Sequence, residues 1–164
     1  MRFFHGFRIK EVLEAKYHLP VMPLNDGKAA ALAELATGHL QGVANGAALV
    51  LGSGLGGGFI INGKLFQGSH FQAGELTFLL PVQMEKVDPS LMRGMTLSAV
   101  GLITKVNEVL GNSDLKDGLA AFKAINAGDE TVYPLFESYC RTLAITILNL
   151  QTAFDMESFV LGGG

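Results

Sequence analysis

Cysteine is almost missing from this sequence of 164 residues, in which Cys140 is the only one. One cysteine excludes a disulfide within the chain and a zinc site built from several of its thiolates. The first residues also lack the continuous apolar segment and small-residue cleavage site of a secretion signal. These absences predict a protein of the cytoplasm.

Strong charge and long apolar runs are equally scarce. The net charge is -3 and there is no long basic run, which excludes the electrostatic footprint of a nucleic-acid-binding protein. The most apolar segment, residues 46–61, is shorter than the roughly 20 residues of a membrane span and contains several glycines. With 49% hydrophobic residues the chain can build a core, so we expect one domain over residues 1–164 without membrane contact.

The N-terminal quarter shows a helix, a strand and a second helix. Apolar residues at helical spacing predict an amphipathic helix over Phe7–His18. Val21–Leu24 has the composition of a short strand, and Asn25-Asp26 opens an alanine-rich helix that Gly38 ends.

Two apolar runs, Ala47–Ser53 and Gly58–Asn62, follow with glycines between them. Asn62-Gly63 is a strong hairpin signal and Lys64–Phe66 is the returning strand, which predicts three consecutive antiparallel strands. Further helices are expected over Leu97–Leu110, Leu115–Ile125 and Asp129–Phe154, and a last buried strand over Ser158–Leu161. The fold class is therefore α/β, with a mixed sheet, an antiparallel hairpin and flanking helices.

Gly52 to Gly58 reads GSGLGGG and predicts a tight backbone turn between two strands. It matches the loose pattern of a dinucleotide-binding loop, which requires a helix after the loop. Phe59–Ile61 and a hairpin follow instead, so a pyrophosphate would find no helix N-terminus there. Two interpretations remain: a turn whose N–H groups approach a phosphate, or a turn without a ligand.

Two acidic positions have the chemistry of a hydroxyl-binding site. Asp26 lies at a strand-to-helix junction, where a rigid carboxylate can accept a proton from an attacking hydroxyl. Asn25 offers a donor and an acceptor to a sugar hydroxyl. The alternative is that Asn25 or Asp26 only caps the helix. Glu75 follows a loop that contains His70, and it is either a second hydroxyl-binding carboxylate or a solvated surface residue.

The segments LNDGKAAALAE, LGSGLGGGFIINGKLFQG and AGEL, in this order and spacing, resemble the ROK family of sugar kinases, which includes glucokinases and fructokinases. FRIKEVLEAKYHLPV and FVLGGG extend the resemblance over most of the chain. The resemblance implies the actin-like ATPase fold, which is ribonuclease H-like, with two lobes and sugar and ATP bound between them. This chain resembles the C-terminal lobe.

The same resemblance implies the site residues. Asp26 would be the catalytic base, and the sugar would be bound by Asn25, Glu75, Thr77 and His70. The ATP phosphates, together with Mg²⁺, would approach Gly52, Ser53, Gly54, Gly56 and Gly57, and the adenosine would lie by Gly162 and Gly163. The reaction would be transfer of the γ-phosphoryl group of ATP to a hexose hydroxyl.

Three departures from the family pattern qualify this expectation. No Asp-x-Gly-Gly-Thr phosphate motif occurs, so we expect the complementary N-terminal lobe to be missing and the chain to be inactive alone. Many members have a histidine at the position of Thr77, followed by a cysteine-rich motif, so no zinc is expected here and no metal ligand is assigned. Lys28 stands where many members have asparagine.

Apolar helical faces would be uncovered in a single lobe, which predicts a homo-oligomer. Two alternatives to a kinase remain. One is the sugar-binding effector module of a ROK transcriptional repressor, although no helix-turn-helix occurs in this chain. The other is an inactive folded remnant.

Overall fold

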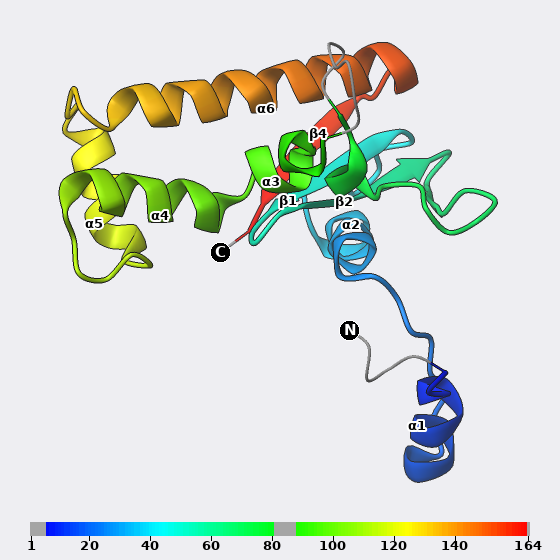
Figure 1. Ribbon diagram of the computed structural model, residues 1–164. Helices are drawn as coiled ribbons and strands as arrows, with labels where there is room; N and C mark the ends of the chain where they lie inside the picture. Colours follow the sequence, from blue (N-terminus) through cyan, green and yellow to red (C-terminus); the bar gives the residue numbers. More distant parts are fainter. Residues whose placement is uncertain (1–5, 81–87, 164) are drawn as a thin grey trace.

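One mixed sheet of four strands organises residues 6–80 and 88–163, the part of the chain described by this computed structural model (Figure 1). The strands are β1 (Gly46–Leu51), β2 (Leu55–Ile61), β3 (Lys64–Phe66) and β4 (Ser158–Gly162). The helices are α1 (Ile9–Tyr17), α2 (Asp26–Thr37), α3 (Arg93–Thr96), α4 (Ala99–Leu110), α5 (Gly118–Asn126) and α6 (Tyr133–Phe154), with short 3-10 helices η2 (Leu76–Phe78) and η3 (Pro89–Leu91).

The strand order is β3-β2-β1-β4. β1, β2 and β3 are consecutive and antiparallel, as predicted, whereas β4 lies parallel to β1. The β2–β3 turn has positive φ at both Asn62 (52°) and Gly63 (70°), the conformation that a two-residue hairpin requires. The local sequence signal for this hairpin is therefore confirmed.

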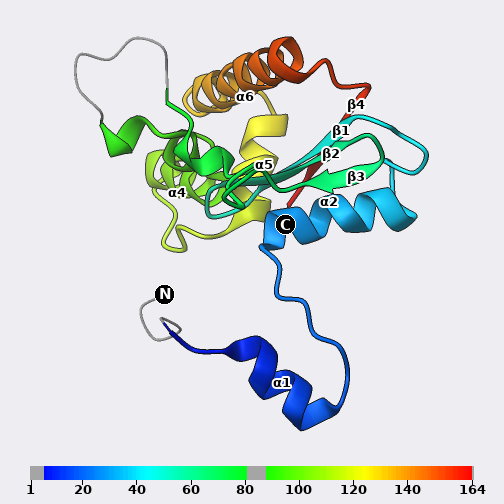
Figure 2. The same ribbon diagram turned by 90° about the vertical axis from the view of Figure 1, so that its right-hand side faces the viewer.

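Helices cover both faces of the sheet, with α2 on one side and α6 on the other (Figure 2). Alternate residues of β1 explain this arrangement, because side chains along a strand point to opposite faces. Ala48 packs with Ala31 of α2 and Ile60, while Ala47 and Leu49 belong to the cluster that meets Leu150 of α6. The central strands β1 and β2 are consequently largely buried. β4 is only partly buried, so the prediction of a buried strand over Ser158–Leu161 is right about the strand and wrong about its burial.

Helices α4, α5 and the first part of α6 form a second layer beside the sheet (Figure 1). Their shared core contains Leu102, Val106, Ala121, Ile125 and Val132. These helices begin later than predicted because capping residues precede them. Ser98 and Asp117 accept from backbone N–H groups at the starts of α4 and α5, and Asp129 accepts from the Thr131 N–H in a turn before α6.

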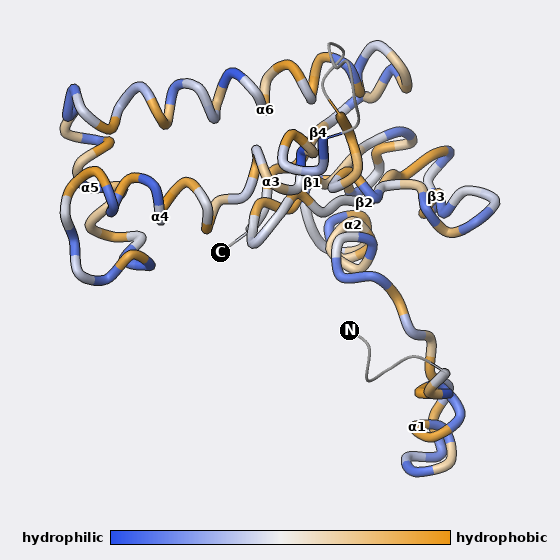
Figure 3. The backbone as a smooth tube through the Cα atoms, viewed as in Figure 1, coloured by the Kyte–Doolittle hydropathy of each residue, from blue (hydrophilic) through white to orange (hydrophobic). Residues whose placement is uncertain are grey.

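Helix α1 extends away from the sheet and has no buried residue (Figures 1 and 2). The predicted helix is confirmed, but its apolar residues Ile9 and Val12 are exposed and Leu13 is only partly buried. Its apolar positions appear as orange segments in Figure 3. The prediction of a strand at Val21–Leu24 is wrong, because this segment has neither helix nor strand structure. No strand of the sheet pairs with it, and the Val21 N–H donates to the Glu14 carboxylate at 3.1 Å instead.

The glycine-rich segment divides into two parts. Only Gly52 to Gly54 form the turn, while Gly56, Gly57 and Gly58 lie within β2, so the predicted turn over Gly52 to Gly58 was too long. The strand glycines let α2 approach β2 closely. A Cβ on Gly58 would lie 2.7 Å from the Ala31 Cβ, and a Cβ on Gly27 would lie 2.5 Å from the Gly57 nitrogen.

Among the described helices, none combines the length and the apolar content needed to cross a membrane.

The close packing of α2 on β2 predicts that Gly58→Ala lowers the free energy of unfolding by about 1–3 kcal/mol, because the added methyl group meets Ala31 and the backbone of Lys28. Gly52→Ala is the matched control, since a Cβ there has no neighbour within 4 Å. Urea unfolding of both variants measures the difference. Equal stability of the two variants would contradict this view of the α2–β2 contact.

Candidate active site

A single pocket collects most of the residues that the sequence singled out. Its lining contains Asn25 and Asp26 from the start of α2, the turn residues Gly52, Ser53 and Gly54, Gly56 of β2, and Glu75 and Thr77 beyond β3, together with Gly27 and Val50. The cavity volume is about 190 Å³. Complete small-molecule sites usually occupy about 300–1,000 Å³, so the described residues provide only part of an enclosure.

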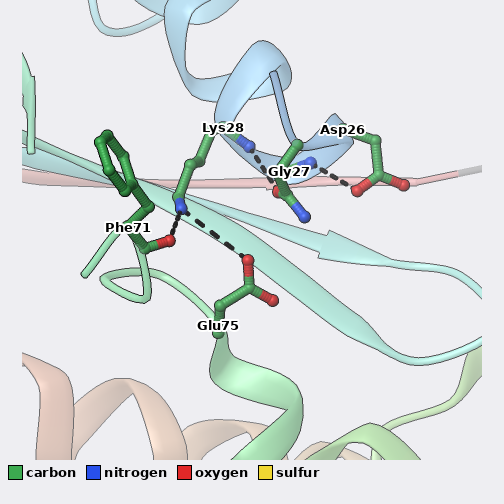
Figure 4. Close-up of polar contacts among 6 residues, drawn as sticks. Asp26, Gly27, Lys28, Phe71 and Glu75 are labelled. Atoms are coloured by element: carbon green, nitrogen blue, oxygen red, sulfur yellow. Dashed lines mark hydrogen bonds and ion pairs between the residues drawn. The ribbon is translucent and has the colours of Figure 1, made fainter. Parts of the chain in front are cut away.

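Asp26 is the first residue of α2, and its side chain is exposed at the pocket. One carboxylate oxygen, Oδ1, accepts from the Gly27 N–H at 2.8 Å (Figure 4). The second oxygen has no hydrogen-bond partner among the described residues. Asp26 therefore has an open acceptor on a side chain whose position the helix fixes.

Asn25 is the N-cap of α2. Its Oδ1 accepts from the Lys28 N–H at 3.2 Å, which confirms the capping interpretation for this residue. The amide NH₂ group takes no part in that bond. Binding of a sugar hydroxyl by this amide stays a prediction, and it is compatible with the capping role.

Glu75 is joined to α2 through Lys28, a contact that the sequence did not reveal. The Lys28 side chain is only 3% exposed, and its Nζ lies 3.8 Å from Glu75 Oε1 and donates to the Phe71 carbonyl (Figure 4). Glu75 keeps 31% of its side chain exposed, at the pocket. The sequence held one signal for this contact, namely a lysine in the first turn of a helix. The helix macrodipole disfavours a cation there unless another group compensates its charge.

The glycine turn is held in place by the start of α4. The Gly52 carbonyl accepts from the Val100 N–H at 3.3 Å and from the Ser98 hydroxyl at 3.4 Å. The Gly52 N–H itself donates to the Gly54 carbonyl at 3.0 Å. The turn thus has a fixed shape, with no side chain on two of its three residues.

A second cavity of about 450 Å³ adjoins the first, because Ser53 lines both. It runs between α4 and α6, and its walls include Ser98, Lys105, Tyr139 and Thr142. Burial raises the pKa of the Tyr139 phenol, and its hydroxyl donates to the Leu97 carbonyl at 3.2 Å. This wall is therefore hydroxyl-rich and carries one lysine.

Several predicted site residues do not line the first pocket. His70 is exposed in the loop after β3, and Gly57 is buried where a Cβ would meet Ala48 and Leu76. Gly162 ends β4 opposite Val50, and Gly163 follows it against Leu51.

Thr77 lines the pocket, but its hydroxyl donates to the Leu55 carbonyl at 2.9 Å.

No group of three or more His, Cys, Asp or Glu side chains that could hold a metal ion occurs within residues 6–80 and 88–163.

Residues 2–164 match the ROK family. A β-glucoside kinase of Listeria innocua is 30% identical over 166 residues, covering 100% of this chain and 56% of the relative. Two solved structures are also similar. The Lmo2764 protein of Listeria monocytogenes has a TM-score of 0.87 at 30% identity, with 100% of this chain and 57% of that chain covered. A ROK glucokinase of Streptomyces griseus in complex with glucose and AMPPNP has a TM-score of 0.76 at 28% identity, with coverages of 94% and 55%.

These similarities confirm the expected actin-like ATPase fold. The chain spans about half the length of the curated relatives it matches.

The two roles of Asn25 can be separated by substitution. Asn25→Ala removes the capping acceptor and should lower the free energy of unfolding by about 1 kcal/mol, whereas Asn25→Asp keeps a capping oxygen and should leave stability nearly unchanged. Urea denaturation provides the comparison. A loss in Asn25→Asp as large as in Asn25→Ala would show that the side-chain oxygen is not what stabilises α2.

Proposed function

The chain belongs to the ROK family, and we propose that it forms one wall of the active site of a sugar kinase, which transfers the γ-phosphoryl group of ATP to a hexose hydroxyl. One observation carries this proposal. Asn25, Asp26, Glu75 and the glycine turn come from three separate parts of the chain, and they line the same pocket. The family members named above as kinases of β-glucosides and glucose support the substrate class.

The sugar would be bound at the start of α2. Glu75 is an acceptor for sugar hydroxyl groups when ionised, and the free NH₂ of Asn25 is a donor. Both residues line the pocket beside Asp26, so a hydroxyl held between them lies near the open oxygen of the Asp26 carboxylate. Such positioning supplies much of the catalysis in phosphoryl transfer.

Asp26 would act as the general base. The hydroxyl oxygen of the sugar forms a bond to the γ-phosphorus of ATP, and its proton passes to Asp26. The bond between the γ-phosphorus and the β,γ-bridging oxygen breaks, and ADP leaves with that oxygen. Asp26 suits this role because one of its oxygens is free and the Gly27 N–H fixes the other.

The glycine turn would accommodate the phosphates of ATP. Gly52 has open space where a Cβ would stand, so an anion can come close to the backbone. The adjoining cavity between α4 and α6 leads away from Ser53 and has room for the nucleoside, with Gly162 and Gly163 at the end of the neighbouring β4.

Mg²⁺ in kinases is held largely by substrate phosphates with one or two carboxylates. The donor set of this pocket fits that pattern, because two carboxylates, Asp26 and Glu75, line it together with the turn at which the phosphates would lie. The bound ion would neutralise the charge that develops on the phosphoryl oxygens.

A second lobe would complete the enclosure over the small pocket. We propose that these 164 residues correspond to the second lobe of a two-lobed kinase, because they match 56% of the Listeria innocua relative and contain no Asp-x-Gly-Gly-Thr phosphate motif. Exposed apolar side chains on α6, Ile145 and Leu148 among them, favour self-association of the protein. We further propose that the protein acts in the cytoplasm, where ATP is available.

The proposal is tested on this chain completed with the unmatched part of the Listeria innocua β-glucoside kinase. ADP release should depend on a hexose or β-glucoside, and Asp26→Asn should lower kcat by about 100-fold or more because the base is lost. Asp114→Asn is the matched control, since Asp114 is exposed and is not among the residues that line the pocket, and an amide oxygen can still accept from the Lys116 N–H.

Full activity of the Asp26→Asn variant would refute the role of the base. Absence of sugar-dependent ADP release from the completed parent protein would count against the kinase function itself.

A further inference from the structure

Lys28 is a buried cation whose partners both belong to one loop. Lysine side chains are almost never fully buried unless they are paired. Here the ammonium donates to the Phe71 carbonyl and forms an ion pair with Glu75, and both residues lie in the segment 67–75 between β3 and η2 (Figure 4). Lys28 itself belongs to the first turn of α2, two residues after Asp26.

The backbone of this loop is unusual at the point that Lys28 contacts. Phe71 has a φ of 58°, a left-handed conformation that is costly for a bulky residue unless its surroundings impose it. The Phe71 side chain is 67% exposed, so packing of the ring does not account for the conformation. The contact that the structure gives to the Phe71 carbonyl is the Lys28 ammonium.

The loop is also fixed at its far end. Gly74 has a φ of 84°, and a Cβ there would lie 2.8 Å from the Gly57 carbonyl oxygen, so the backbone lies directly against β2. The Glu75 N–H donates to the Gln72 carbonyl at 3.1 Å. Within the loop, between the end of β3 and the contact of Gly74 with β2, the Lys28 side chain reaches across from α2.

We propose that Lys28 is a positioning residue, which anchors the loop of residues 67–75 to α2 and holds the Glu75 carboxylate at the pocket. The link between this role and sugar binding rests on the function proposed above. Because Lys28 and Asp26 share the first turn of one helix, the anchor fixes the distance between the two carboxylates. Glu75 can then meet one sugar hydroxyl while Asp26 meets another.

A positioning role and a structural role lead to different results. Removing one partner of an ion pair is strongly destabilising when the other charge is left buried. Here Glu75 keeps 31% of its side chain exposed, so water can solvate its carboxylate after Lys28 is replaced, and the cost of burying the ammonium is no longer incurred. Lys28→Met keeps a long unbranched stem in the buried site and removes the charge. We therefore expect the melting temperature to be unchanged or higher, while the loop loses its attachment to α2.

Hydrogen exchange of the 164-residue chain measures the loop directly. The amides of Ala73, Glu75 and Leu76 donate within the segment 67–76 and report whether it opens. In Lys28→Met their exchange should be about tenfold faster or more, since a hydrogen bond from a charged group is lost. The amides of β1 should exchange as in the parent. Lys64→Met is the matched control, because Lys64 is exposed on the adjacent β3.

Glu75→Gln gives a second route to the same contact, and it leaves the buried ammonium bonded to Phe71. It should accelerate exchange of the same amides, by less than Lys28→Met does. Loop exchange that stays at the parent level in either Lys28→Met or Glu75→Gln would overturn the proposal.

The link to sugar is tested in the completed kinase with glucose and ATP as substrates. Lys28→Met should raise KM for glucose about tenfold and leave KM for ATP unchanged, and Lys28→Arg, which keeps the charge, should recover part of the loss. An unchanged KM for glucose, or equal changes in both KM values, would overturn the positioning role. If the parent protein phosphorylates no sugar, the proposed function fails, and the exchange experiment still decides whether Lys28 anchors the loop.

Discussion

The close contact between α2 and β2 is the constraint on which the rest of the site depends. Helices normally keep a distance set by their side chains, but here Gly27 faces Gly57, and Gly58 faces Ala31, so backbone meets backbone. The first turn of α2 is thereby brought beside the turn at Gly52 to Gly54, which connects β1 to β2. Asp26 lies next to a potential phosphate position because these glycines have no side chains.

Lys28 extends the same arrangement to a third element. Its buried ammonium connects the helix that carries Asp26 with the loop that carries Glu75, so two acidic side chains from distant parts of the sequence face one pocket. A charged group at this position is energetically unfavourable by itself, both because it is buried and because it lies near the positive end of a helix. The hydrogen bond and the ion pair offset that cost, and in the positioning role proposed for Lys28 they hold Glu75 where a sugar would bind.

Features with local signals could be predicted from the sequence. Asn62-Gly63 determines its hairpin, Asn25 caps its helix, and the order of helices and strands follows from the pattern of apolar residues. Features that depend on distant residues could not be predicted. The Lys28–Glu75 pair requires the fold to bring two segments together, and the strand glycines of β2 look like part of a turn until α2 is seen packed against them. Val21–Leu24 has the composition of a strand but pairs with no strand in the part of the chain that the structure describes.

In the proposed kinase, Asp26, Glu75 and the glycine turn form parts of one site for sugar and nucleotide. A crystal structure of the completed kinase with glucose and AMPPNP tests it most directly. We expect a glucose hydroxyl within about 3 Å of the Asp26 carboxylate, a second hydroxyl bonded to Glu75, and the phosphates against the backbone of Gly52 to Gly54. Glucose bound without contact to either carboxylate, or phosphates bound away from the turn, would contradict it.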